Sequence, residues 1–209
     1  MTRPEPTILA FDTSAAHCAA ALLLGGKVVA ERFEEMKRGQ AERLFPMLDE
    51  VLWDVGAVWE ELDAIGVGVG PGNFTGVRIS VSAARGLALS LGIPAVGVSV
   101  FEVAQQMGHA SRCGIEWTEY LPAPRGSAYA QTFRHGKPEG VPRIVDGFED
   151  DPLSGHYMEV DWSGQTLHAL AKCARDKLTD GTDLSVPAPL YIRPPDAAPA
   201  SDPPPVILP

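Results

Sequence analysis

The segment DAIGVGVGPGNFTGVRISVSAARGLALSLGIPAVGV, residues 63–98, carries the signals of a strand, a glycine-rich turn, a helix and a second strand. Residues 63–69 are mostly small or β-branched and predict a strand, whereas residues 77–91 repeat apolar side chains at helical spacing. The Gly-Ile-Pro triplet at residues 92–94 ends the helix, and residues 95–98 predict the next strand. Strand–helix–strand units join parallel strands through a right-handed crossover. The segment therefore predicts an α/β fold.

The residues before this segment complete the predicted sheet. Three strands are expected there, at residues 7–12, 17–24 and 27–33. The last two are joined by Gly25 and Gly26, which suit a tight hairpin turn. Apolar side chains at helical spacing predict a helix over residues 40–54, and another helix is expected near residues 100–108. The order predicts a mixed five-stranded sheet covered by helices, the ribonuclease-H-like arrangement, as an N-terminal lobe over residues 1–108.

The second half of the chain has weaker patterns. Residues 128–133 and 141–145 predict a hairpin, residues 157–160 a short strand and residues 164–178 an amphipathic helix. These elements suggest a shortened C-terminal lobe over residues 109–193. Nine of the 19 prolines fall between Pro187 and Pro209, so residues 194–209 are expected to form an extended, Pro-rich tail.

Composition restricts the class of protein. The chain has 209 residues, 45% hydrophobic and 21% charged, as expected for a globular protein. Its formal net charge of -10 repels phosphate backbones, which argues against strong direct binding of nucleic acid. The three cysteines offer neither a disulfide framework nor CxxC spacing, and no signal peptide is visible. The longest uncharged run is interrupted by Gly92 and Pro94, so no membrane span is predicted and we expect a cytoplasmic protein.

Two segments predict an anion or nucleotide site. A glycine-rich turn that leads from a strand into a helix offers backbone N–H groups to a phosphate. An acid and two hydroxyls at the end of the first strand would face the same region. The candidate residues are Asp12, Thr13, Ser14, Gly70, Gly72, Asn73, Thr75 and Gly76. However, the loop matches neither the GxGxxG fingerprint nor the Walker A motif. A close-packed turn with a capping Asp12 explains the same residues, and both interpretations stay open.

No catalytic or metal-binding constellation is found in the sequence. The five histidines are scattered without a pair at zinc spacing, and residues 97–101 lack the closing glycine of a nucleophile elbow. We therefore predict no catalytic residues, no metal and no required cofactor, although weak binding of ADP or ATP is compatible with the fold.

Two helices carry more apolar surface than one sheet face needs. The helix at residues 77–91 has a second apolar stripe, and the helix at residues 40–54 ends with an aromatic on its polar side. The predicted partner-binding residues are Leu44, Met47, Val51, Trp53, Ile79, Ser80, Ala83 and Leu87. The alternative is that these two helices simply pack on each other within one lobe.

Five segments together resemble the TsaB (YeaZ) family of tRNA threonylcarbamoyladenosine biosynthesis proteins. They are ILAFDTS (8–14), RGQAERLFPMLDEVL (38–52), LDAIGVGVGPGNFTGVRIS (62–80), AARGLALSLGIPAVGVSVFE (83–102) and APLYIRPPDAAP (188–199). The resemblance is dense over residues 7–104. The chain departs from the family at Gln40, where His is common, and at Pro122, where an acidic residue is common.

The resemblance implies a two-lobe fold of the actin/sugar-kinase/Hsp70 type and a heterodimer with the catalytic subunit TsaD, joined by the ATPase TsaE. It also implies a homodimer when the chain is alone. Where TsaD carries two metal-binding histidines, this sequence has Val100 and Ala104. The implied function is a non-catalytic subunit that activates TsaD for threonylcarbamoyl transfer to adenosine of tRNA. The alternatives are an enzyme of the same fold, either a small-molecule kinase or ATPase or a metallopeptidase, and a free-standing homodimer that senses nucleotide.

Overall fold

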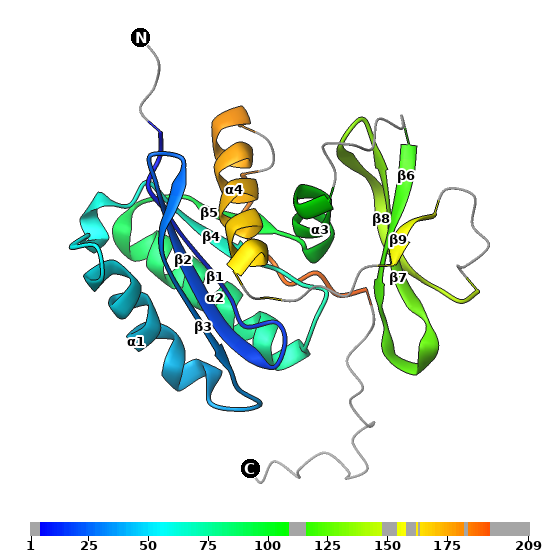
Figure 1. Ribbon diagram of the computed structural model, residues 1–209, viewed down its shortest axis with the longest axis horizontal. Coiled ribbons are helices and arrows are strands. Elements are labelled where there is room, and N and C mark those ends of the chain that lie inside the picture. The colour runs from blue at the N-terminus through cyan, green and yellow to red at the C-terminus, as the bar shows by residue number, and fades with distance from the viewer. Residues whose placement is uncertain are drawn as a thin grey trace, which may run out of the picture.

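The computed structural model describes residues 5–108, 116–147, 154–157, 162, 164–181 and 184–192, which form two separate β-sheets and the helices packed on them (Figure 1). The first sheet has five strands in the order β3-β2-β1-β4-β5. They are β1 (Ile8–Asp12), β2 (His17–Leu24), β3 (Lys27–Glu35), β4 (Ala64–Gly68) and β5 (Ala95–Val98). Strands β1, β2 and β3 pair antiparallel, and β4 is parallel to β1 and to β5. The predicted mixed five-stranded sheet is confirmed.

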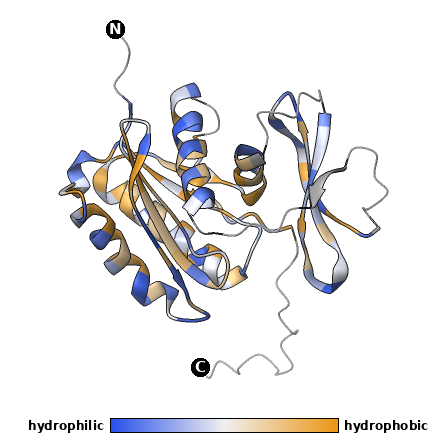
Figure 2. Ribbon diagram, in the orientation of Figure 1, coloured by the Kyte–Doolittle hydropathy of each residue, from blue (hydrophilic) through white to orange (hydrophobic). Residues whose placement is uncertain are grey.

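Helices cover both faces of this sheet. Helices α1 (Gln40–Trp53) and α2 (Phe74–Leu91) share one apolar core with one face, and α3 (Val100–Gly108) and α4 (Gly164–Asp180) share another with the opposite face. Every residue of β1 and β4 is buried because helices lie above and below them. Helix α1 shows both hydrophilic and hydrophobic colours in Figure 2, as expected for an amphipathic helix on a sheet.

Helix α2 begins three residues before its predicted start. Asn73 is its N-cap, and the Asn73 side-chain oxygen accepts hydrogen bonds from the backbone N–H groups of Thr75 and Gly76. At the other end, Gly92 adopts a left-handed conformation as the C-cap, as the Gly-Ile-Pro signal predicted.

The second sheet has four strands in the order β8-β7-β6-β9. They are β6 (Glu116–Pro122), β7 (Ala128–Arg134), β8 (Lys137–Val145) and β9 (Ser154–Tyr157). The predicted hairpin is confirmed as β7 and β8, and β6 was not predicted. The short strand expected at residues 157–160 is found at Ser154–Tyr157, and residues 158–160 lie outside the described part. Trp117, Leu121 and Phe133 of this sheet pack into the core that contains α3.

Two segments from late in the chain return to the first sheet. Helix α4 packs across β1, β2, β4 and β5, so the second half of the chain supplies one layer of the first-half structure. Residues 184–192, here called the strap, run back to the loop after β4, where the Leu190 N–H donates to the Val69 carbonyl at 2.8 Å. The lobe boundaries at residues 108 and 193 remain a proposal, and residues 194–209 lie outside the described part. Within the described part, no helix is long and apolar enough to cross a membrane.

Candidate functional site

The structure brings the two segments of the candidate anion site together. The loop after β1 and the loop after β4 meet at the carboxyl ends of two adjacent parallel strands, where ligands of α/β proteins commonly bind. The Thr13 hydroxyl donates to the Gly76 carbonyl at 2.7 Å, and the Asn73 N–H donates to the Ser14 carbonyl at 2.5 Å. Residues far apart in the sequence therefore form one compact turn.

Glycine is required in this turn because the two loops touch. A Cβ atom at Gly76 would lie 1.9 Å from the Thr13 carbonyl oxygen, and one at Gly72 would lie 2.4 Å from the Ser14 carbonyl oxygen. Gly70 has a φ of 92°, in the left-handed region that favours glycine. Close packing therefore accounts for these glycines without a ligand.

The backbone donors at the helix end of the turn, from Thr75 to Val77, are already used. The Asn73 side chain accepts from the N–H groups of Thr75 and Gly76 at 3.0 and 3.1 Å, and the Val77 N–H donates to the Asn73 carbonyl at 2.9 Å. In an anion-binding helix terminus these N–H groups point at the ligand instead. Of the two interpretations left open by the sequence, the geometry favours the close-packed turn.

Asp12 organises the loop from inside the protein. Its Oδ1 accepts hydrogen bonds from the Ser14 N–H at 2.7 Å, the Ser14 hydroxyl at 2.8 Å and His17 Nε2 at 2.9 Å. Its Oδ2 is buried, has no hydrogen-bond partner among the described residues and lies 1.8 Å from the position of a Cβ at Gly68. His17 in turn packs against Phe33 and Trp162. Asp12 therefore holds a capping position, as the second interpretation of the sequence proposed.

The described residues contain no group of three or more His, Cys, Asp or Glu side chains that could hold a metal ion. Of the scattered histidines, His109 lies outside the described part.

The predicted partner-binding residues divide into buried and exposed sets. Leu44, Met47, Val51 and Ser80 are buried inside the protein, where the three apolar side chains fill the core below α1 and α2. These four are corrected from surface to core residues. The apolar stripe of α1 covers the sheet, and the buried Ser80 of α2 donates its hydroxyl to the Gly68 carbonyl of β4. Ile79, Ala83 and Leu87 are partly buried against the same core. Trp53, at the end of α1, is 85% exposed.

The sequence pattern singled out one stripe of α2 but not the most exposed face of this helix. That face carries the small residues Thr75, Ser82 and Gly86 together with Arg78, Arg85 and Leu89, which is 87% exposed. A Cβ at Gly86 would meet no atom within 4 Å, so the fold of this chain does not require a glycine there. The sequence does contain one indication of this face, because Gly86 lies in the middle of a strongly helical segment where glycine is unfavourable.

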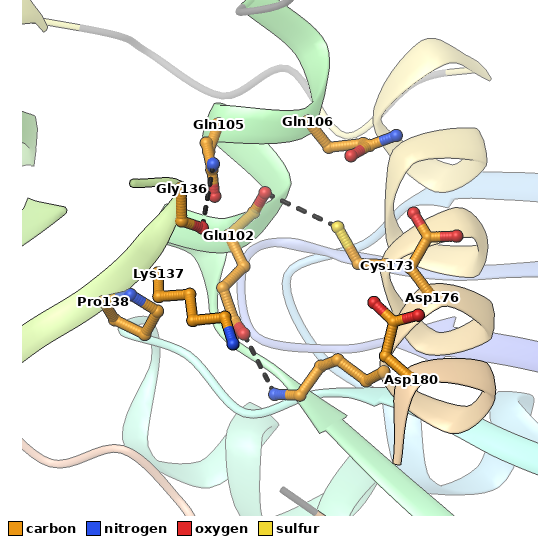
Figure 3. A pocket seen from close by; sticks show the side chains of 10 residues that line it. Glu102, Gln105, Gln106, Gly136, Lys137, Pro138, Cys173, Asp176 and Asp180 are labelled. Atoms are coloured by element: carbon orange, nitrogen blue, oxygen red, sulfur yellow. Dashed lines mark hydrogen bonds and ion pairs between the residues drawn. The ribbon is translucent and has the colours of Figure 1, made fainter. Parts of the chain in front are cut away.

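A cavity of about 390 Å³ lies between α3, α4 and the turn of the β7–β8 hairpin (Figure 3). Glu102 accepts from the Ser99 N–H at 2.7 Å and from Lys177 Nζ at 2.9 Å, while Lys177 also donates to the Gly97 carbonyl at 2.8 Å. The charges of Glu102 and Lys177 are therefore matched. The hydrogen bonds between Ser99 and Glu102 could have been predicted from the sequence, because the two residues have the spacing of a capping box.

Cys173 lines the same cavity, and its thiol is directed at the Glu102 carbonyl (Figure 3). Burial raises the pKa of the Cys173 thiol far above its usual range. Burial also raises the pKa of Cys18 to about 12. Neither cysteine has the exposed, electropositive surroundings of a nucleophile.

Comparison with known proteins gives a consistent picture. The chain is 33% identical over 187 residues to the tRNA threonylcarbamoyladenosine biosynthesis protein TsaB of Escherichia coli (strain K12), which covers 85% of this chain and 80% of that protein. It is 40% identical to TsaB of Bacillus subtilis (strain 168) over 102 residues, 49% of this chain and 44% of that protein. A family model described as TsaD, tRNA N6-adenosine threonylcarbamoyltransferase, matches residues 27–122.

Solved structures show the same fold. The structure of YeaZ from Pseudomonas aeruginosa matches with a TM-score of 0.66 and 25% identity, covering 89% of this chain and 99% of that one. A second structure, of an uncharacterized protein with similarity to the peptidase YEAZ from the same organism, matches with a TM-score of 0.71 at 24% identity, over 90% of this chain and 100% of that one.

Proposed function

This chain belongs to the TsaB family of tRNA threonylcarbamoyladenosine biosynthesis proteins, and on that basis we propose that it is a non-catalytic subunit that binds and activates a TsaD-type catalytic subunit. The observation that carries the proposal is the similarity to TsaB, which extends over most of both chains rather than over one motif. The match to the TsaD family model covers only residues 27–122, the part that contains most of the first sheet.

Features of the site support the absence of catalysis. The N–H groups of Thr75 and Gly76 in the glycine-rich turn are occupied by Asn73. The acids Asp12 and Glu102 are engaged in structural hydrogen bonds. Val100 and Ala104, where the resemblance places the metal-binding histidines of TsaD, are buried apolar residues of α3. The net charge of -10 fits a subunit that leaves contact with tRNA to a partner.

The outer face of α2 is the proposed docking surface for the catalytic subunit. A glycine inside a helix costs about 1 kcal/mol relative to alanine, and Gly86 has no neighbour within the chain that demands it. Together with Ser82 and Thr75, Gly86 forms a low ridge on which a partner helix can approach closely. The partly buried Ile79 extends this surface. The exposed Trp53 lies beside Arg32 of β3 and Glu50 of α1, and we propose it as a separate contact of the partner. A homodimer of the chain alone would use the same ridge, and a TsaE-type ATPase would join the heterodimer.

The variant Gly86→Gln tests this surface. Because a side chain at Gly86 meets open space in the monomer, the variant folds and gains about 0.5–1 kcal/mol of unfolding free energy. The same side chain prevents close approach, so we expect affinity for the TsaD-type subunit to fall at least tenfold in calorimetric titration. Val141→Gln, at an 84% exposed position on the second sheet, is the matched control. Unchanged affinity of Gly86→Gln would place the interface elsewhere.

A further inference from the structure

Arg78 is held rigidly at the surface, near the start of α2. Its guanidinium carbon lies 3.8 Å from the centre of the Phe74 ring, and its Nε donates to the Tyr191 hydroxyl at 2.7 Å. The Phe74 and Tyr191 rings also stack, with centroids 4.9 Å apart. The strap residue Tyr191 and the helix residue Phe74 therefore fix the guanidinium in one orientation.

The terminal amino groups of Arg78 remain open for a ligand. Neither makes a hydrogen bond or ion pair with another described residue, whereas Arg32, Arg43 and Arg134 are each paired with carboxylates of this chain. A planar guanidinium whose rotamer is already fixed binds a carboxylate at low entropic cost, and arginine is enriched among the residues that dominate interfaces. On a chain with a net charge of -10, an open cation of this kind marks a site for an acidic group.

An apolar pocket of about 480 Å³ lies farther along the same edge of α2, between the helix and the start of the strap. It is bordered by the apolar residues Leu89, Ile93, Leu184 and Val186, with Arg85 at its margin. The Leu89 and Val186 side chains are 87% and 66% exposed. Arg78 and Leu89 are eleven positions apart in one helix, which corresponds to about 16 Å along its axis.

We propose that this edge of α2 binds a segment of the TsaD-type subunit that presents a carboxylate to Arg78 and a bulky apolar side chain to the pocket at Leu89. The inference rests on the proposed function and assigns the residues that give it specificity. In the partner, the two groups would be separated by about three turns of helix or about five extended residues. An RNA phosphate is the less favoured ligand for Arg78, because the surrounding charge is negative.

The test is the dissociation constant for the purified TsaD-type subunit of the same organism, measured with Arg78→Ala and Leu89→Asp. Both residues are exposed, so each variant is expected to fold and to bind at least tenfold more weakly. Arg78→Ala also removes one exposed hydrogen bond to the strap. Arg143→Ala and Val141→Asp, at exposed positions of β8, are the charge-matched and apolarity-matched controls and should bind within twofold of wild type. Arg78→Lys keeps the charge but loses the planar fork, so it should be intermediate.

The outcomes separate the inference from the proposed function. If the wild-type chain fails to bind the subunit, the proposed function fails and the inference with it. If the wild type binds and both variants bind within twofold of it, only the inference is overturned. A loss of tRNA affinity by the assembled complex without loss of subunit affinity would assign Arg78 to RNA and would also overturn it.

Discussion

At the scale of single residues, the glycines Gly68, Gly76 and Gly86 have different structural roles, although the sequence alone does not distinguish them. Gly68 and Gly76 are required by contacts inside the chain, since a Cβ would lie 1.8 Å from Asp12 Oδ2 or 1.9 Å from the Thr13 carbonyl oxygen. Neither clash is easily relieved by movement. The Asp12 carboxylate is held in place by hydrogen bonds, and the Thr13 atom involved is a backbone carbonyl oxygen. Gly86 has open space around its Cα.

We therefore expect opposite effects of alanine at these positions. Gly68→Ala and Gly76→Ala should lower the free energy of unfolding by about 1–3 kcal/mol or more through overpacking. Gly86→Ala should raise it by up to about 1 kcal/mol through helix propensity. Urea denaturation of the three variants measures the differences, and equal effects at all three positions would contradict the assignment.

The residues of the candidate site could be recognised from the sequence, but their role could not. Asp12 and the glycine-rich turn were identified, and the structure places them together. Whether the N–H groups of the turn are free for an anion depends on the side chain of Asn73 and on the Ser14 carbonyl, 59 positions before Asn73 in the sequence. Periodicity and motif spacing contain no information about such a contact.

At the scale of elements, the ion pair between Lys177 of α4 and Glu102 of α3 joins segments from the two halves of the chain. Both side chains are more than four-fifths buried, with exposures of 16% and 18%, and Lys177 also donates to the Gly97 carbonyl. Lys177→Met keeps most of the apolar stem but leaves Glu102 without its cation.

Loss of this partner should lower the free energy of unfolding by about 1–3 kcal/mol. The double variant Lys177→Met with Glu102→Gln should recover part of the loss, because no charge is then left unpaired. Chemical denaturation of the two single variants and the double variant gives the coupling free energy. A coupling free energy near zero would show that the pair contributes nothing to the contact between α3 and α4.

The predicted elements were most accurate where the apolar pattern is regular. The strands and helices of the first sheet follow their predicted order for this reason, although β1 and β4 are buried on both faces. Strand β6 was missed because its buried residues mix polar with apolar side chains, so the segment shows neither alternation nor a continuous apolar run. These residues are Thr118, Glu119, Tyr120 and Leu121. The helix at residues 164–178 was predicted from its apolar stripe. Such a stripe shows that one face of the helix is buried, but it does not show that the helix packs on the first sheet.

At the scale of the whole molecule, the glycine-rich turn at the carboxyl ends of β1 and β4 uses the N–H groups of Asn73, Thr75 and Gly76 for hydrogen bonds within the chain. We therefore expect no saturable binding of Mg·ATP or Mg·ADP to the isolated chain below about millimolar concentration, since phosphate recognition depends on free backbone N–H groups. Isothermal titration calorimetry measures this directly. Micromolar binding that Gly72→Ala abolishes would show instead that the turn opens to accept a nucleotide.

The most direct test of the central claim is reconstitution of threonylcarbamoyladenosine formation on tRNA. Purified TsaD-type and TsaE-type subunits of the same organism would be supplied with tRNA and the threonylcarbamoyl donor, with and without this chain. We predict product only when the chain is present, a rate that saturates at a fixed ratio of chain to TsaD-type subunit, and no product from the chain alone. Equal product formation without the chain, or turnover by the chain in the absence of the TsaD-type subunit, would contradict the account.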